Sequence, residues 1–331
     1  MPKFPQKIKD IVLAVTYQCN SQCEFCHIWR KKTASSLKPK DYKNLPRTIQ
    51  NVNISGGEPF LRNDLSKIVQ TIKSRCPRAK IIISTNGFLS QEIKKQTKKI
   101  LKIEPGIGIT VSLDGLKKIH EKLRGVKNGF KQALQTIEIL KKLKIKNLKI
   151  AFTINDHNFQ ELRKVYQLSK ELNLEFSFAV CHNSPHYFQK EDNKISRLKE
   201  MEKEIIWLIS QELRGFSLKR WLRAYFAWGL LRFIQTGQRI LPDYSGLRSL
   251  FIDPFGRIYP SDVWNLRLGK IQEITNWPKF LKTSQRIILT KSQSKPNNWM
   301  ICTARQSMKK HWLKAGWWIL SNKPYGKIIS V

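Results

Sequence analysis

Three cysteines near the start of the chain have the types and spacing of a metal site. Cys19, Cys23 and Cys26 are separated by three and then two residues, and they follow an apolar run, residues 11–16, that predicts a strand. Thiolates are the natural ligands of iron–sulfur clusters. If this segment is a loop, its thiols can bind three irons of one cubane and leave the fourth iron open. An open iron could bind a small chelating molecule and pass it an electron.

The cysteine spacing is also compatible with two other structures, a buried helix and a zinc site. The spacing would also place them on one stripe of a buried helix, but the polar residues between them make a poor core helix. A structural zinc ion usually has four protein ligands in closed geometry. His27 is a residue type that could serve as the fourth zinc ligand. It directly follows Cys26 in the chain, however, and two neighbouring residues do not easily occupy two corners of one tetrahedral site. A zinc-stabilised nucleic-acid-binding protein therefore stays as an alternative to the cluster.

Further residues suited to binding a small molecule follow other predicted strands. Gly56 and Gly57 let backbone approach a ligand closely, and Glu58, just before Pro59, offers a carboxylate to an ammonium group. Ligands of parallel sheets bind where the strands end. Short polar or acidic side chains stand at those ends: Thr85, Asn86, Ser112, Asp114, Thr153 and Asn155.

Together, these segments resemble the radical S-adenosylmethionine (radical SAM) superfamily. The Cys-x3-Cys-x2-Cys loop, with Phe25 before its third cysteine, is similar to the hallmark of that superfamily. Ser55-Gly56-Gly57-Glu58-Pro59 resembles the GGEP motif that contacts the SAM amino group. Segments 84–87 and 112–115 resemble those that line the ribose and methionine side of SAM. The resemblance covers residues 8–180.

The resemblance implies a [4Fe–4S] cluster held by Cys19, Cys23 and Cys26, with SAM chelated to the fourth iron. It implies that SAM is cleaved reductively to methionine and a 5′-deoxyadenosyl radical, which abstracts hydrogen from a substrate. A low-potential donor such as ferredoxin or flavodoxin would supply the electron. The residues expected to bind SAM are Phe25, Gly56, Gly57, Glu58, Pro59, Thr85, Asn86, Ser112, Asp114, Arg124, Thr153 and Asn155.

The elements that must position these residues alternate along the chain. Strands are predicted at 11–16, 52–55, 80–84, 107–113, 148–154 and 175–180, and helices at 64–75, 91–101, 129–143 and 158–172, with a less regular helical pattern over 41–48. This alternation predicts an α/β fold with a parallel sheet, either doubly wound or curved into an incomplete barrel. We expect an incomplete (β/α)6 TIM-like barrel with a small α+β C-terminal extension.

The pattern changes after residue 180. Residues 193–214 and 217–237 predict two consecutive helices, the turn Asp253-Pro254-Phe255-Gly256 predicts a β-hairpin between 247–252 and 257–259, and a last helix is predicted over 303–320. We therefore divide the chain into three parts. Residues 1–190 form a radical SAM partial barrel, residues 191–240 a helical connection and residues 241–331 an extension.

Segments 250–260 and 299–303 resemble the SPASM extension, in which many radical SAM enzymes hold auxiliary clusters. Ser261 and Asn298 stand where that extension usually has cysteines, so only Cys302 remains of the expected ligands. We expect a degenerate extension that covers the barrel mouth and holds no auxiliary cluster; if such a cluster exists, Cys302 must be in it. The SPASM-like features favour a peptide or protein substrate over a surface-sugar or lipid precursor.

The chain carries 61 Lys and Arg against 24 Asp and Glu, a formal net charge of +37. Such a charge attracts phosphates, nucleic acid or an anionic membrane surface. The basic residues are spread along amphipathic patterns, so solvated helix faces explain most of them, and no basic and aromatic motif of a nucleic-acid module is present. An RNA-modifying radical SAM enzyme would reconcile the charge with the cysteines and stays as a further alternative.

The sequence predicts neither a signal peptide nor a transmembrane segment. Six cysteines without a secretory signal indicate a reducing compartment, and we expect a cytoplasmic protein. Cys76 and Cys181, which lie outside the motifs, are expected to be small buried apolar residues.

Overall fold

A nine-stranded sheet organises the computed structural model, which describes residues 7–31, 33 and 36–323. The outer ends of the first and last predicted parts, residues 1–6 and 324–331, lie outside the described residues. The strand order is β6-β5-β4-β3-β2-β1-β7-β8-β9. Strands β1 to β7 are parallel, and β8 and β9 are antiparallel to their neighbours.

The six predicted strands of the barrel are confirmed, with ends shifted by at most two residues. They are β1 Asp10–Ala14, β2 Asn51–Ser55, β3 Lys80–Thr85, β4 Gly108–Ser112, β5 Asn147–Ile154 and β6 Glu175–Val180. The buried β-branched residues of these strands form the centre of the core. Since β6 and β9 are the two ends of the strand order and do not pair with each other, the sheet is open. The expected incomplete barrel is confirmed.

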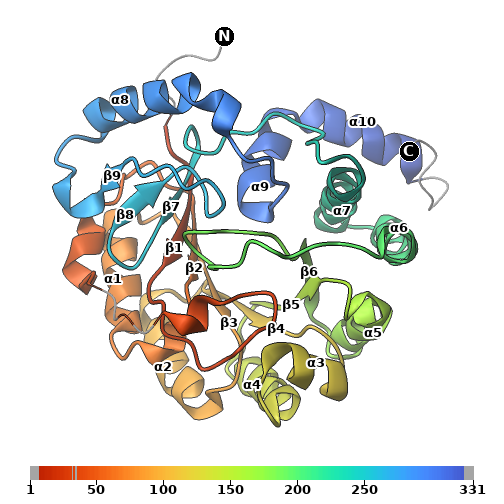
Figure 1. Cartoon of the computed structure of the whole chain (residues 1–331). Coiled ribbons are helices and arrows are strands. Elements are labelled where there is room, and N and C mark those ends of the chain that lie inside the picture. Colours follow the sequence, from red (N-terminus) through yellow and green to blue (C-terminus); the bar gives the residue numbers. More distant parts are fainter. Residues whose placement is uncertain (1–6, 32, 34–35, 324–331) are drawn as a thin grey trace.

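Helices cover the outside of this sheet (Figure 1). They are α1 Leu65–Arg75, α2 Ser90–Ile103, α3 Lys117–Arg124, α4 Gly129–Lys142 and α5 Leu162–Glu171, and short 3-10 helices stand at η1 Ile28–Arg30, η2 Pro39–Asn44, η3 Pro59–Leu61 and η4 Phe159–Glu161. Apart from α3, each of these α-helices buries one stripe of mostly apolar side chains, as in α2, where Ile93 and Ile100 have no exposed surface. The predicted helices are thus present in the order expected.

Two details of this region differ from the prediction. The helical pattern over 41–48 is the 3-10 helix η2, which begins with Pro39; proline suits the first position of a helix because it needs no donor there. Helix α3 was not predicted, because its eight residues are mostly charged and only His120, Leu123 and Arg124 are buried.

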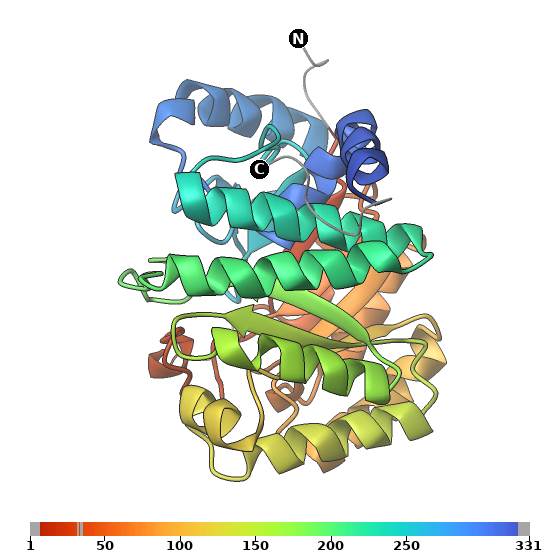
Figure 2. The same cartoon turned by 90° about the vertical axis from the view of Figure 1, so that its right-hand side faces the viewer.

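The C-terminal part continues the same sheet. Strand β7, Ser249–Ile252, pairs in parallel with β1, and the predicted hairpin to β8, Arg257–Tyr259, is confirmed; β9, Gly269–Lys270, completes the edge. Helices α6 Leu198–Arg214 and α7 Leu218–Thr236 pack against each other beyond β6 (Figure 2).

Three further helices follow the sheet. They are α8 Trp277–Thr290, α9 Ile301–Lys310 and α10 Trp312–Asn322, with short turns η5 Ile271–Glu273 and η6 Ser292–Ser294. Helix α8 was not predicted. The single helix predicted over 303–320 was wrong: α9 packs on β1 and β7, whereas α10 packs on α7, so the chain changes direction at His311. No helix of the described residues is long and apolar enough to cross a membrane.

Candidate functional site

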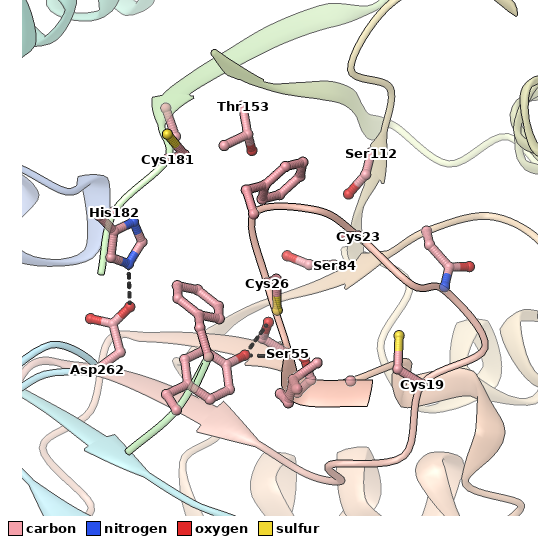
Figure 3. Close-up of a pocket in the computed structure, with 18 of the residues that line it drawn as sticks. Cys19, Cys23, Cys26, Ser55, Ser84, Ser112, Thr153, Cys181, His182 and Asp262 are labelled. Carbon is pink, nitrogen blue, oxygen red and sulfur yellow. Dashed lines mark hydrogen bonds and ion pairs between the residues drawn. The ribbon is translucent and has the colours of Figure 1, made fainter. Parts of the chain in front are cut away.

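A cavity opens over the carboxyl ends of the parallel strands. Its wall includes strand-end residues of β2 to β5, namely Ser55, Ser84, Thr85, Ser112 and Thr153. The loop after β1 lies across these ends and carries all three cysteines of the predicted cluster site into the same cavity (Figure 3). Since parallel strands end at one edge of the sheet, residues as far apart in the chain as Cys19 and Thr153 meet there, as the sequence predicted.

The cysteine loop is fixed to the end of α3. Backbone N–H groups of Gln22 and Glu24 donate to the carbonyl oxygens of Arg124 and Leu123, at 2.9 and 3.0 Å. The Ser21 hydroxyl donates to the Arg124 carbonyl at 3.0 Å and lies 3.1 Å from Cys23 Sγ. These bonds hold the loop in an irregular conformation, so its cysteines are not part of a helix.

The cysteine loop is also held by the glycine pair after β2. Gly57 N–H donates to the Thr16 carbonyl at 2.7 Å, and Glu58 N–H donates to the Gln18 carbonyl at 2.8 Å. A Cβ on Gly57 would overlap the Gln18 carbonyl, and Gly56 has a φ of +139°. Both positions therefore need glycine, because the two backbones approach each other too closely for a side chain.

The chemistry of the three thiols fits an iron–sulfur cluster. Burial, together with the neighbouring Cys23, raises the pKa of both Cys19 and Cys26 to about 12, so both thiols keep their protons at neutral pH unless a metal binds the sulfur. Within the described residues, no three His, Cys, Asp or Glu side chains converge on a single metal ion. A cluster needs no such convergence, because each thiolate binds a different iron. The donor set therefore fits a cluster better than a zinc ion.

The Glu58 carboxylate is completely buried behind the cavity wall rather than on it. It accepts hydrogen bonds from Thr85 Oγ1 at 2.9 Å, from Asn86 N–H at 2.8 Å and from Phe60 N–H at 3.1 Å. Burial raises its pKa to about 7, although the hydrogen bonds favour the charged form. Glu58 thereby ties the end of β2 to the end of β3, where Asn86 faces the cavity.

A buried ion pair supports the opposite side. Arg124 donates from Nε to Asp114 Oδ2 at 2.6 Å, and Asp114 Oδ1 accepts from Thr153 N–H at 2.8 Å. Although burial disfavours a charged guanidinium, the Asp114 carboxylate keeps the pKa of Arg124 above its usual value. The guanidinium lies over Phe25, with Cζ 5.5 Å from the ring centroid.

The predicted SAM-binding residues occupy two layers. On the cavity wall, with the three cysteines, lie Phe25, Gly56, Gly57, Thr85, Asn86, Ser112, Arg124 and Thr153. Glu58 and Asp114 lie fully buried behind the wall, and Pro59 is buried at the start of η3. Asn155 lines an adjoining cavity that shares Cys23 and Phe25 with the first. The sequence did not distinguish these layers.

Several residues of the wall were not singled out from the sequence. Tyr187 lies 3.1 Å from the Ser55 hydroxyl and donates to the Gly56 carbonyl at 3.2 Å. It belongs to a polar and aromatic segment, residues 182–188, that directly follows β6. The rule that ligands bind where parallel strands end applies to this segment as well and would have identified it.

The C-terminal part also reaches the cavity. His182 Nε2 lies 3.6 Å from Asp262 Oδ2, and Cys302 Sγ lies 3.9 Å from Asp262 Oδ1. Cys181 lines the same wall and is buried, as is Cys76, which lies away from the cavity with its thiol 3.4 Å from the Pro46 carbonyl. The extension thus contributes the Asp262 carboxylate and the Cys302 thiol to one side of the cavity, where Asp262 pairs with His182 of the segment after β6 (Figure 3).

Comparisons with known proteins agree with this arrangement. Residues 13–169 match the family model described as the Radical SAM superfamily. Among curated proteins, the chain is 26% identical over 223 residues to a probable GTP 3′,8-cyclase of Metallosphaera sedula. This alignment covers 64% of this chain and 68% of the relative. A probable GTP 3′,8-cyclase of Saccharolobus islandicus is 26% identical over 230 residues, covering 67% of this chain and 70% of the relative.

Two solved structures share the fold. Streptococcus suis SuiB bound to S-adenosylmethionine aligns with a TM-score of 0.61 at 19% identity, covering 85% of this chain and 68% of that one. The protein anSMEcpe, with bound AdoMet and a Cp18Cys peptide, aligns with a TM-score of 0.59 at 21% identity, covering 83% of this chain and 80% of that one. At these sequence identities, the similarity shows a shared fold and does not show a shared function.

Proposed function

We propose that this chain, which belongs to the radical SAM superfamily, holds its [4Fe–4S] cluster on Cys19, Cys23 and Cys26 and abstracts hydrogen from a substrate in the adjoining cavity. The enzyme class and the two cofactors, the cluster and SAM, follow from the family. One observation carries the assignment of residues. The three thiols, the glycine pair and the polar strand ends line a single cavity.

Once bound, the cofactors would supply the difficult chemistry, the one-electron reductive cleavage of SAM that starts hydrogen abstraction. The protein itself binds SAM and orients it. Asn86, Thr85 and the backbone of Gly56 and Gly57 offer donors and acceptors at the positions expected to bind SAM. Phe25 offers a flat face to the adenine. Its wall position beside the cysteines supports that role.

Glu58 and Asp114 act as positioning residues in this proposal. Glu58 holds the backbone of Asn86, and Asp114 holds both the Arg124 guanidinium and the backbone of Thr153. Because their carboxylates are fully buried, they act through these residues rather than on SAM. A rigid binding wall reduces the entropy cost of orienting the cofactor.

We favour a peptide or protein as the substrate. Of the described residues that line this cavity, Arg124 alone is a Lys or Arg, and its guanidinium is already paired with Asp114. A triphosphate would need several cations. The side formed by the segment after β6 and by the C-terminal part is instead apolar and neutral, with Phe188, Met300 and Ile301, apart from the pair of His182 with Asp262. Such a wall suits a peptide side chain better than a surface-sugar or lipid precursor with a diphosphate.

A second candidate is the cyclisation of GTP. It is favoured by the names of the curated relatives, probable GTP 3′,8-cyclases, at 26% identity. The scarcity of cations among the described residues of the first cavity weighs against it, whereas Arg30, Lys190 and Lys194 line the adjoining cavity. Modification of RNA remains the third candidate, supported by the net charge of +37.

The three substrate classes can be separated with one readout. The reconstituted enzyme is given SAM and dithionite without oxygen, and 5′-deoxyadenosine is quantified with a pool of synthetic peptides, with GTP or with RNA oligonucleotides. We expect stimulation by peptides and no GTP-derived product by mass spectrometry. Conversion of GTP, or stimulation by RNA alone, would replace the peptide with that substrate. In the cell, a low-potential donor such as ferredoxin or flavodoxin would replace dithionite, in a reducing compartment such as the cytoplasm.

A further inference from the structure

Helix α10 has one apolar face that nothing in the described chain covers. Ala315, Trp318 and Ile319 are buried against the body of the protein, where Trp318 stacks on Trp228 of α7 with ring centroids 5.0 Å apart. The opposite face is also apolar but open, and its large side chains are 67 to 74% exposed: Trp312, Leu313, Trp317 and Leu320. Soluble proteins rarely expose so many adjacent large apolar side chains without a function.

The turn between α6 and α7 extends this face. Phe216 is 93% exposed and Leu218 is 65% exposed. The turn adjoins the end of α10, because Lys323 Nζ, at that end, lies 4.7 Å from the centroid of the Phe216 ring. We call the six residues the α10 patch: Trp312, Leu313, Trp317, Leu320, Phe216 and Leu218.

Positive charge surrounds the α10 patch. Residues 274–331 contain eleven Lys and Arg and no Asp or Glu. Lys309 and Lys310, at the end of α9, and Lys314, within α10, are exposed and next to the apolar residues of α10 in the chain. Arg214 is exposed just before Phe216, and Lys219, just after Leu218, is exposed and paired with Glu175. The patch is therefore complementary to a surface that is negatively charged outside and apolar beneath.

An anionic bilayer has those two properties together. Helices that lie in the membrane interface combine Trp, Phe and Leu on one face with Lys and Arg beside them, and tryptophan is enriched at the level of the headgroups. RNA would use the lysines but would not bury Leu313 or Leu320. A second copy of this chain would bring its own lysines against those of the first, and like charges oppose such an interface. With 11 residues, α10 is too short to span a bilayer.

We propose that the α10 patch seats this chain on the surface of an anionic lipid bilayer. Helix α10 lies in the plane of the headgroups with Leu313, Trp317 and Leu320 directed toward the acyl chains, while Lys309, Lys310 and Lys314 contact anionic headgroups. Since α9 runs from the cavity wall at Ile301 and Cys302 to α10 (Figure 1), the cavity stays clear of the docked face.

The test uses the whole chain and vesicle flotation. Vesicles of phosphatidylcholine alone are compared with vesicles of equal parts phosphatidylcholine and phosphatidylglycerol, at low and at physiological salt. One variant carries Leu313→Ser, Trp317→Ser and Leu320→Ser; a second carries Lys309→Gln, Lys310→Gln and Lys314→Gln. The matched control removes three exposed lysines of α2, on another side of the molecule, with Lys94→Gln, Lys98→Gln and Lys99→Gln. Circular dichroism and iron content establish that each variant folds.

We expect the wild type to bind the anionic vesicles and both α10 variants to bind them at least about tenfold more weakly, since each lysine near such a surface contributes about 1 kcal/mol. The α2 control should bind as the wild type does. Three results would overturn the proposal: no binding to anionic vesicles at low salt, an equal loss in the α2 control, or binding unaffected by the serine substitutions. A wild-type dimer that the serine substitutions dissociate, without any vesicle binding, would assign the patch to self-association instead.

Discussion

The Arg124 guanidinium lies beside the sulfur of Cys23, with Nη1 3.6 Å from Sγ. The backbone carbonyl of Arg124 also accepts hydrogen bonds from Ser21 and Gln22, so this residue holds the cysteine loop by both its side chain and its backbone. The guanidinium thereby directs a hydrogen-bond donor at the sulfur of an expected cluster ligand, and such contacts orient the ligands of a metal site. The ion pair with Asp114 therefore connects the end of β4 to the expected cluster site.

Removing the charge of Arg124 should destabilise the protein and lower its iron content. Arg124→Gln leaves the fully buried Asp114 carboxylate without its cation, and breaking such a pair costs about 3–5 kcal/mol. The measurement is chemical denaturation together with iron analysis after reconstitution. Arg163→Gln is the matched control, because the Arg163 side chain is 48% exposed in its pair with Glu204 and should contribute less than about 1 kcal/mol. Similar losses in the two variants would contradict the assigned role of Arg124.

Glu58→Gln should weaken SAM binding while leaving the cluster in place. All three partners of the Glu58 carboxylate donate hydrogen bonds to it. The NH2 group of a glutamine is also a donor, so it must face at least one of these donors. The lost hydrogen bond loosens the backbone of Asn86. We expect the Kd for SAM to rise about tenfold, which corresponds to the roughly 1.4 kcal/mol of one charge-assisted bond. Anaerobic calorimetry with the reconstituted protein measures it. Unchanged affinity with unchanged iron would remove Glu58 from the account.

Gly57→Ala should prevent the cluster from assembling. The added methyl group overlaps the Gln18 carbonyl, and relief of that overlap must move the backbone just before Cys19. Gly316→Ala on α10 is the control, since its Cβ would meet no atom within 4 Å. Iron and sulfide per chain after reconstitution measure the effect. The Gly57 variant should lose most of its iron and the Gly316 variant none; full iron in Gly57→Ala would mean that the loop tolerates displacement.

The buried His120 should make the protein less stable in acid. Its Nδ1 accepts a hydrogen bond from Asp114 N–H at 3.1 Å, which requires the neutral ring, and burial followed by the nearby Arg124 lowers its pKa from 6.5 to about 3. The unfolded chain therefore binds a proton between these values and the folded chain does not, so stability present above pH 6.5 is lost as the pH falls.

By pH 5 the loss from His120 amounts to about 2 kcal/mol. His120→Asn keeps an acceptor for Asp114 N–H but does not titrate, so the difference in Tm between pH 7.5 and pH 5 should shrink in this variant. His186, whose pKa burial lowers to about 4, should retain its own contribution. An unchanged pH dependence in His120→Asn would show that His120 is not buried in its neutral form.

Much of the barrel could be predicted because its signals are local. Each strand is a short β-branched run, and the residues that follow β2, β3, β4 and β5 share one edge of a parallel sheet wherever the strands are adjacent. The cavity wall was therefore predictable from position in the chain. The two layers of the site were not: the partners of Glu58 come from η3 and from the end of β3, and only the folded sheet brings them to one carboxylate.

The C-terminal part was harder to predict because its boundaries depend on packing. Residues 301–322 have a helical pattern that only Gly316 interrupts, so the sequence does not mark a break at His311. The chain changes direction there because α9 and α10 pack on different elements. His182 and Asp262 were missed for the same reason. They are 80 positions apart, and their contact at 3.6 Å requires β7 to join the sheet beside β1.

The most direct test of the account replaces Cys19, Cys23 and Cys26 with alanine together and compares this variant with the wild type without oxygen. The variant Cys76→Ala, which lacks a buried cysteine outside the cavity, controls for the loss of a thiol. Iron, sulfide and 5′-deoxyadenosine formed from SAM and dithionite are measured for each protein. We predict about four irons per chain and 5′-deoxyadenosine for the wild type and for Cys76→Ala, and neither for the triple variant. Iron and SAM cleavage retained by the triple variant, or a wild type that binds zinc and does not cleave SAM, would contradict the account.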